Sequence, residues 1–204
     1  MSHGPAPWMG YAERVSERDP AQRKTVLVPL AAGFEEIEAV VIIDVLRRGG
    51  IDVRVAGLAR GPVTGSHGIT LATDCTLDEV AAAELAMIVL PGGMPGAANL
   101  ERDARVLALV RELESSGRTV AAICAAPRVL STAGVLRGRK ATAYPSVRPL
   151  LAGAEVVDRP RVVRSGPVVT SQGVGTALEF ALELVGELAG PAKARELRTA
   201  LLVE

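Results

Sequence analysis

Short apolar runs alternate with amphipathic helical patterns along this chain, and that alternation limits the folds it can adopt. The β-branched run at 25–30 predicts a buried strand. Residues 35–48 begin with acidic side chains and end with arginines, which predicts a helix that stops at Gly49 and Gly50. A second strand is predicted at 52–56. Because a strand–helix–strand unit of this length joins parallel strands, we expect a parallel sheet.

The remaining sequence continues the same alternation. It predicts strands at 86–90, 118–123, 161–164 and 167–171, a hairpin within 61–73, and helices at 103–115, from near Pro127, at 175–188 and at 192–202. Strands that lack polar alternation are buried on both faces. The sequence therefore predicts an α/β sandwich in which helices cover both faces of a mostly parallel sheet.

The chain length and the character of its N-terminal segment indicate one domain with a tail. A chain of 204 residues suits a single domain. Residues 1–23 are polar and aperiodic, so we expect a disordered or loosely attached tail before a domain at 24–204. The sequence contains neither an apolar run of about 18 residues nor an apolar leader, so neither a membrane span nor a signal peptide is expected.

Charge and aromatic content argue against a dedicated nucleic-acid surface. Lysines and arginines number 23, as do aspartates and glutamates, which gives a formal net charge of zero. Nucleic-acid binders, in contrast, gain affinity by neutralising phosphates. Aromatic residues make up 2% of the chain, too few for the stacking platforms that hold single-stranded bases.

The cysteines and histidines are few and scattered. Cys75 and Cys124 lie far apart, which is neither a disulfide framework nor a metal-ligand spacing. With His3 and His67 as the only histidines, we expect no metal site. Cys75 in a loop-like stretch is interpreted as structural, and His67 in the glycine-rich hairpin as a surface residue. A reducing cytoplasm is the expected compartment.

Cys124 is the strongest candidate for a reactive group. It directly follows the apolar run that ends at Ile123 and precedes a helix that opens near Pro127. A strand-to-helix turn of this kind presents a nucleophile at the edge of a sheet. The helix N-terminus favours a thiolate, so the pKa of Cys124 is expected to fall. A small buried apolar cysteine fits the same spacing.

Glu38 is the second candidate. Its neighbours on a helix are Val41, Ile42 and Val45, so its carboxylate is expected to face an apolar environment that raises its pKa. A carboxyl group with a raised pKa can move a proton to or from a reacting atom. The alternative is a carboxylate stabilised by the helix dipole, an interpretation that suits Glu35 and Glu36 better.

Two glycine motifs follow predicted strands. Gly92 and Gly93 allow close backbone approach, and their N–H groups together with that of Ala125 would form an oxyanion hole. Taken alone, the motif is only a tight turn. Gly173 and Gly175 look like half of a dinucleotide fingerprint, but residue 178 is a leucine, so a helix-entry turn is favoured.

Four segments taken together resemble the ThiJ/PfpI superfamily, most closely the branch of the parkinsonism-associated deglycases and bacterial YajL. The segments are AAGFEEIE at 31–38, VLPGG at 89–93, AAICAAP at 121–127 and TSQGVGT at 170–176. The resemblance extends from Lys24 to the C-terminus. It implies a flavodoxin-like three-layer sandwich that usually forms a homodimer.

The resemblance also implies roles for individual residues. Cys124 would be the nucleophile, Glu38 its protonated partner, and Gly92, Gly93 and Ala125 would surround the reacting carbonyl. Relatives in this branch are described as cofactor-free glyoxalases, as deglycases of early glyoxal adducts on proteins and nucleotides, and as oxidation-sensitive chaperones. The human branch has a histidine near the cysteine, where the present chain, like YajL-related members, has an aromatic residue, Tyr144.

These residues suggest three possible functions. The leading hypothesis is an enzyme in which Cys124 attacks a reactive dicarbonyl such as methylglyoxal, giving lactate, with Glu38 as proton shuttle. The second is an oxidation-sensing chaperone without turnover. The third, a cysteine peptidase or amidotransferase, requires a histidine beside or after the cysteine. Residue 125 is an alanine and both histidines precede Cys124, so this third hypothesis is the weakest.

Overall fold

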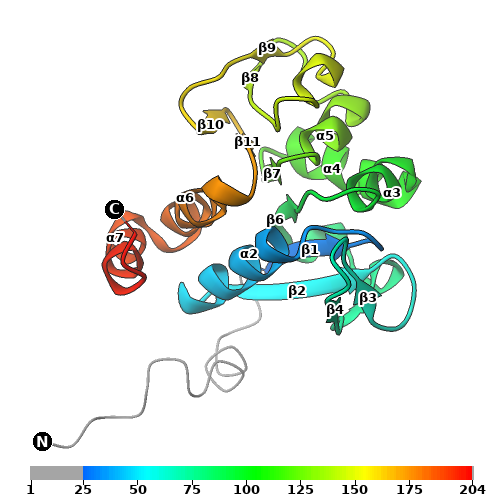
Figure 1. Ribbon diagram of the computed structural model, residues 1–204, viewed down its shortest axis with the longest axis horizontal. Helices are drawn as coiled ribbons and strands as arrows, with labels where there is room; N and C mark the ends of the chain where they lie inside the picture. The colour runs from blue at the N-terminus through cyan, green and yellow to red at the C-terminus, as the bar shows by residue number, and fades with distance from the viewer. Residues whose placement is uncertain (1–24, 204) are drawn as a thin grey trace, which may run out of the picture.

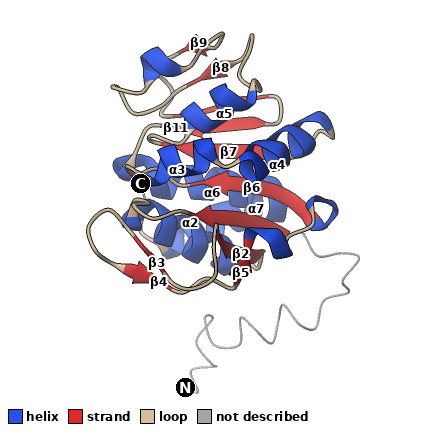
Figure 2. Ribbon diagram, turned by 90° about the vertical axis from the view of Figure 1, so that its right-hand side faces the viewer, coloured by secondary structure: helices blue, strands red, loops and turns tan. Residues whose placement is uncertain are grey.

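A seven-stranded sheet forms the middle layer of the fold, with helices on both faces (Figure 1, Figure 2). The computed structural model describes residues 25–203. The strand order is β10-β11-β7-β6-β1-β2-β5, and the pairing is parallel except between β10 and β11. The strands are β1 (Thr25–Leu30), β2 (Asp52–Gly57), β5 (Cys75–Thr76), β6 (Leu85–Leu90), β7 (Thr119–Ile123), β10 (Val162–Ser165) and β11 (Val168–Ser171). The architecture is the predicted flavodoxin-like α/β sandwich.

The helices divide into two layers. One layer comprises α2 (Glu36–Arg48), α6 (Ala177–Ala189) and α7 (Pro191–Ala200), and the other α3 (Gly96–Arg102), α4 (Ala104–Ser115) and α5 (Pro127–Ala133). Each layer packs its apolar face on one face of the sheet, so that a separate hydrophobic core lies on each side. In α4, for example, Val106, Val110 and Leu113 are fully buried at helical spacing, which explains why the sequence pattern found this helix.

Two small sheets complete the fold. An antiparallel hairpin joins β3 (Val63–Thr64) to β4 (Thr70–Leu71), and a parallel pair joins β8 (Lys140–Ala141) to β9 (Glu155–Val156). The hairpin is the one predicted within 61–73. The β8–β9 pair was not predicted, because two-residue strands carry no periodicity.

The differences from the sequence prediction are local. Helix α3 was not predicted because it follows a turn rich in proline and glycine, residues typical of loops. Cys75 was expected in a loop, but it pairs with Ala56 as the first residue of the short edge strand β5. The predicted tail at 1–23 lies outside the described residues. Within residues 25–203, none of the helices is long and apolar enough to cross a membrane.

The packing of α6 against α2 leads to a prediction about the unfolding free energy of the protein. Phe180 on α6 has 0% exposure, so Phe180→Ala removes a full aromatic contact and leaves a cavity in the core. We expect a loss of about 3–5 kcal/mol in unfolding free energy, measured by urea denaturation. Leu178→Ala on the same helix is the matched control, because Leu178 is 39% exposed. Equal effects of the two variants would contradict the assigned burial.

Candidate functional site

Cys124 lies at the carboxyl end of β7 in a backbone conformation that is rare outside glycine. Its φ is 62°, in the left-handed region that side chains seldom adopt. The surrounding chain holds this conformation from both sides: the N–H of Cys124 donates to the carbonyl of Ser171 at 3.0 Å, and its carbonyl accepts from the N–H of Tyr144 at 2.9 Å. The strand–turn–helix context predicted for Cys124 is present, with Pro127 in the first turn of α5.

Glu38 stands in the first turn of α2 and is completely buried. Its Oε2 accepts a hydrogen bond from the N–H of Gly92 at 2.8 Å, and the Cys124 thiol interacts with the same carboxyl group. Its Oε1 is buried without a partner of conventional hydrogen-bond geometry among residues 25–203. Burial therefore raises the pKa of Glu38 to about 7, against the lowering effect of the Gly92 hydrogen bond. This is the direction predicted from the sequence.

Gly92 permits the contact between the two side chains. A Cβ at this position would lie 2.6 Å from Cβ of Cys124 and 2.7 Å from Oε2 of Glu38. Any larger residue would force the cysteine and the glutamate apart. The β6–α3 turn is thus shaped so that its backbone touches both functional side chains.

The backbone also provides hydrogen-bond donors to the sulfur. The N–H groups of Gly93 and Ala125 both donate to the sulfur of Cys124. Gly93 has a φ of 90°, and a Cβ there would lie 2.2 Å from the backbone nitrogen of Glu35. Gly92 differs from its sequence-based role, because its N–H group is bound to Glu38 rather than directed at a reacting oxygen.

The pKa of Cys124 is the clearest departure from the sequence prediction. Burial of the thiol raises its pKa, and the carboxylate of Glu38 raises it further, to about 12. The predicted fall is wrong for two reasons. Helix α5 has only seven residues, and its dipole is outweighed by a buried negative charge beside the sulfur. A proton on Glu38 removes that charge, so the thiolate becomes accessible when Glu38 holds the proton.

Two residues at the site were not assigned a role from the sequence. A Cβ on Gly173 would lie 3.5 Å from the ring of Tyr144 and 3.9 Å from the sulfur of Cys124. Gly173 therefore lies next to the sulfur, and the ring of Tyr144 lies next to Gly173. The sequence motif at Gly173 was interpreted only as a helix-entry turn, and the short 3-10 turn Val174–Thr176 before α6 confirms that part.

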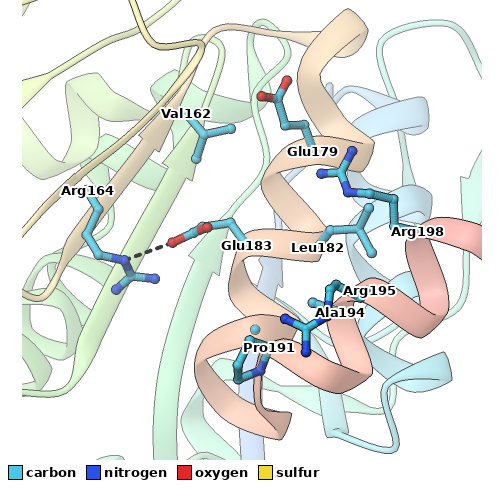
Figure 3. Close-up of a pocket in the computed structure, with 10 residues that line it drawn as sticks. Val162, Arg164, Glu179, Leu182, Glu183, Pro191, Ala194, Arg195 and Arg198 are labelled. Carbon is cyan, nitrogen blue, oxygen red and sulfur yellow. Dashed lines mark hydrogen bonds and ion pairs between the residues drawn. The ribbon is translucent and has the colours of Figure 1, made fainter. Parts of the chain in front are cut away.

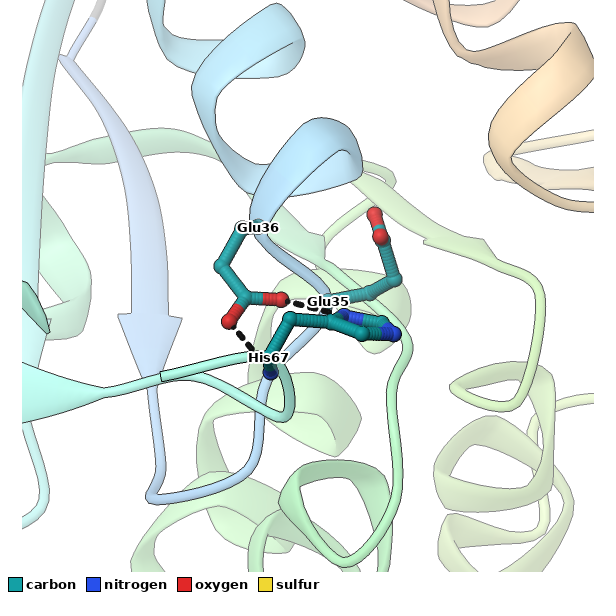
Figure 4. A group of neighbouring side chains, drawn as sticks. All are labelled: Glu35, Glu36 and His67. Atoms are coloured by element: carbon teal, nitrogen blue, oxygen red, sulfur yellow. Dashed lines mark hydrogen bonds and ion pairs between the residues drawn. The ribbon is translucent and has the colours of Figure 1, made fainter. Parts of the chain in front are cut away.

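Glu35, Glu36 and His67 form a cluster whose ligand atoms lie within 4.8 Å of one another (Figure 4). Two carboxylates and an imidazole are donors that a divalent metal ion accepts. Here the donors are already engaged. Glu36 accepts from the backbone N–H of His67 at 2.6 Å and contacts its Nδ1 at 2.9 Å, while Glu35 caps α2 by accepting from the N–H of Glu38 at 2.6 Å.

The cluster fastens the hairpin to α2. Ser66 and Ile69 add hydrogen bonds to Glu36, and the side chain of His67 is 72% exposed beyond it. Burial opposes ionisation of Glu36, but the hydrogen bonds from His67 and Ile69 lower the pKa of Glu36 to about 2. The hydrogen bond to Glu36 also raises the pKa of His67. His67 is thus a surface residue, as predicted, with a structural partner.

A groove between β10, α6 and α7 has a volume of about 420 Å³ (Figure 3). Its floor is apolar and includes Val162 and Leu182. Its Arg164 donates to Glu183 at 3.0 Å and to Glu187 at 2.9 Å, so that charge is neutralised within the protein. The lining residues of the groove include neither a cysteine nor a histidine, and none of the residues at the Cys124 site is among them.

Comparison with known proteins identifies the family of this chain. The family model described as the DJ-1/PfpI family matches residues 24–187. The chain belongs to the DJ-1/PfpI family. It is 45% identical over 182 residues to the Drosophila melanogaster protein dj-1beta, covering 88% of this chain and 97% of that protein.

Other members of the DJ-1/PfpI family extend the comparison. The crystal structure of Drosophila melanogaster DJ-1beta superposes with a TM-score of 0.86 at 44% identity, covering 89% of this chain and 99% of that chain. The oxidised form of Toxoplasma gondii DJ-1 superposes with a TM-score of 0.83 at 40% identity, covering 88% and 98%. A Pyrococcus horikoshii protein named a deglycase is 38% identical over 149 residues, which cover 72% of this chain and 89% of that protein.

The charge coupling between Glu38 and Cys124 predicts a change in thiol reactivity. Glu38→Gln removes the carboxylate that raises the pKa of the thiol, so the midpoint of Cys124 alkylation by iodoacetamide should move to lower pH. The pH–rate profile of alkylation, with Cys75→Ala as background, measures this shift. Glu36→Gln is the matched control, since Glu36 bonds the hairpin instead. An unchanged midpoint, or one moved to higher pH, would contradict the coupling.

The hydrogen bonds that Glu36 accepts predict an unfolding free energy that depends on pH. Because the folded-state pKa is lowered from 4.5 to about 2, the stabilisation is present above pH 4.5 and is lost as the pH falls toward 2. Glu36→Gln should therefore lower the unfolding free energy at neutral pH, and its difference from the unmodified protein should shrink across that window. Urea denaturation at several pH values tests this, with exposed Glu155→Gln as control. A difference independent of pH would refute it.

Proposed function

We propose that this protein converts methylglyoxal to lactate without a cofactor, with Cys124 as nucleophile and Glu38 as proton shuttle. The observation that carries the proposal is the contact between a fully buried carboxyl group, with its pKa raised to about 7, and a cysteine at a strand end. A group with a pKa near 7 both takes and gives protons at neutral pH. The relatives named DJ-1 and deglycase support a reactive site in this family.

The reaction begins when the Cys124 proton passes to Glu38 and the thiolate attacks the aldehyde carbon. The bond formed is C–S, and the carbonyl oxygen becomes the oxyanion of a hemithioacetal. The N–H groups of Gly93 and Ala125, which act on the sulfur of Cys124, would stabilise that oxyanion.

Glu38 then moves a proton between adjacent carbons. Glu38 first gives the proton it took from the thiol to the oxyanion, which becomes the hydroxyl of the hemithioacetal, and Glu38 is a carboxylate again. The carboxylate then removes the hydrogen from the former aldehyde carbon and passes this proton to the ketone oxygen, which gives an enediol. Finally, Glu38 moves the hydroxyl proton of the first carbon to the neighbouring carbon. The first carbon is oxidised to a thioester and the second is reduced to an alcohol, so no external oxidant is consumed. Water cleaves the thioester, releasing lactate and restoring the thiol.

The same chemistry extends to early glyoxal adducts of proteins and nucleotides. In an early adduct an amine has added to the aldehyde carbon, giving a hemiaminal that keeps the oxygen as a hydroxyl. Attack by Cys124 would form the C–S bond and break the C–N bond, and the amine would leave with the proton held by Glu38, giving the same hemithioacetal. Tyr144, next to Gly173, is 51% exposed, which leaves this side of the site open to a larger substrate. The Pyrococcus horikoshii relative named a deglycase supports this extension.

An oxidation sensor with chaperone output is the second candidate function. The specific observation in its favour is the pair of N–H groups at the sulfur, which could hold the oxygens of an oxidised cysteine, with protonated Glu38 as a further donor. Each oxygen would come from a peroxide, which is reduced to water. The Toxoplasma gondii relative has been solved in an oxidised form.

A peptidase or amidotransferase role receives less support. Both need a histidine to deprotonate the cysteine. Residue 125 is an alanine, and His67 is bonded to Glu36 on α2. Glu38 is the acid–base group in contact with the thiol instead.

A homodimer in a reducing cytoplasm is the proposed setting. Ile37 and Val40 on α2 are 54% and 45% exposed, and Ile69, which bonds to Glu36 through its N–H, is 56% exposed. These side chains form an apolar surface suited to a second copy of the chain. Both cysteines are unpaired, as expected in a reducing compartment.

The proposal predicts lactate formation from methylglyoxal in the absence of glutathione. Cys124→Ala should abolish turnover, and Glu38→Gln should lower kcat by at least about 100-fold, because it removes the acid–base group and keeps the shape. Cys75→Ala is the matched control and should keep full activity. Lactate is measured by an enzymatic assay on fully reduced protein.

Three outcomes separate the alternatives. Activity that depends on both Cys124 and Glu38 supports the enzyme. Full activity of Glu38→Gln would overturn the proton-shuttle role. A folded, reduced protein that forms no lactate, yet is oxidised by peroxide at Cys124 before Cys75, would replace the enzyme with the sensor.

A further inference from the structure

A cavity of about 630 Å³ lies at the carboxyl ends of β1 and β2, beside the end of α3. Its walls come from the end of β1 and the residues after it (30–32), from the segment between β2 and the end of β3 (58–64), and from α3 and the residue after it (99 and 102–103). None of the residues assigned to the Cys124 site lines it. The carboxyl edge of a parallel sheet is where ligands bind in α/β folds, so a cavity at this edge is a candidate binding site.

The walls of this cavity are fixed by hydrogen bonds between segments. Nη2 of Arg105 donates to the carbonyl of Leu58 at 2.9 Å, and Nδ2 of Asn99 donates to the carbonyl of Ala32 at 3.0 Å. The N–H of Gly33 donates to the carbonyl of Thr64 at 2.9 Å. The cavity is therefore preformed, which reduces the ordering that a ligand would have to impose.

The charge lining the cavity is positive. Arg102 has no carboxylate within ion-pair distance among residues 25–203, and Arg60 has only Glu79, at 3.7 Å with an 87% exposed guanidinium side chain. The one acid in the lining, Asp103, is bound by Arg105 at 2.6 Å. Arg102 is thus left for a ligand, and Arg60 has only a long, exposed ion pair that a ligand could replace. Arg164 in the groove beside α6 is, in contrast, neutralised by its own glutamates.

Apart from Thr64 and Asn99, the remaining side chains of the lining are apolar. Leu30 and Ala31 are buried at the end of β1, and Leu58, Pro62 and Val63 continue this surface from β2 to the hairpin. A ligand that fits must therefore present a negative group to the arginines and a short hydrocarbon part to this wall. Guanidinium groups bind carboxylates through paired hydrogen bonds.

We propose that this cavity is a second ligand site, which binds a small organic carboxylate with a short branched apolar chain. The carboxylate contacts Arg60 and Arg102, and the chain packs on Leu58 and Val63. The site acts independently of the chemistry at Cys124, so it exists whether or not the proposed enzymatic function is correct.

Isobutyrate and its neutral isostere isobutyramide are suitable probes. Each is titrated into the full-length protein while backbone amide shifts are followed by NMR. Isobutyrate should shift the amides of 58–64 and 99–103, and isobutyramide should bind at least about fivefold more weakly, because it lacks the charge. This comparison needs no mutation, so it does not depend on the folding of a variant.

The arginines are tested by substitution. Arg60→Gln and Arg102→Gln should each weaken isobutyrate binding by about threefold to fivefold, and the double variant by at least about tenfold. Arg137→Gln, an exposed arginine outside the cavity, is the matched control. Equal affinity for the two probes, unchanged binding by the double variant, or shifts centred on 92–93 and 124–125 would each overturn the proposal.

Discussion

The arrangement of this protein depends on the burial of one carboxyl group where three strands end. Glu38 has 0% exposure, and its Oε2 is held by the N–H of Gly92 while the Cys124 thiol interacts with the same group. Removing a carboxylate from water is expensive unless it is neutralised. A proton shared with the thiol is the neutralising partner here, and this requirement links α2, the β6–α3 turn and the β7–α5 turn in one site.

The sheet makes this burial possible. Cys124 packs against the cores on both sides of the sheet, so the turn that carries it is anchored in the two layers at once. The left-handed backbone of Cys124 is held by Ser171 on the neighbouring strand β11 and by Tyr144. Fixed backbone of this kind lets a site keep its donors aimed at a reacting atom without reorganisation.

Much of the fold and part of the candidate site could be predicted from the sequence, and the exceptions have physical causes. Periodicity identified the long helices and the buried strands, because each buries one face or both. The same patterning placed Glu38 among apolar neighbours and predicted the direction of its pKa shift. The pairing of Glu38 with Cys124 was implied by the family resemblance and not by the local pattern. The pKa of Cys124 was predicted from the helix N-terminus alone to fall, whereas it rises.

Tertiary contacts explain the other misses. The N–H of Gly92 is taken by Glu38, a contact across 54 residues that no local pattern reveals. Gly173, which lies next to the sulfur and to the ring of Tyr144, comes from a segment far along the chain. Helix α3 was missed because loop-forming residues precede it. In each case the local sequence is compatible with several structures, and packing selects one.

The protonation state of Glu38 is the most direct test of this account. Infrared difference spectra between acidic and alkaline pH should show a carboxylic acid band that titrates near pH 7 and is absent from Glu38→Gln. The S–H band of Cys124 should respond in the same pH range, because the two groups share a proton. A Glu38 that titrates at the ordinary value of 4.5, with no response at the sulfur, would contradict the account.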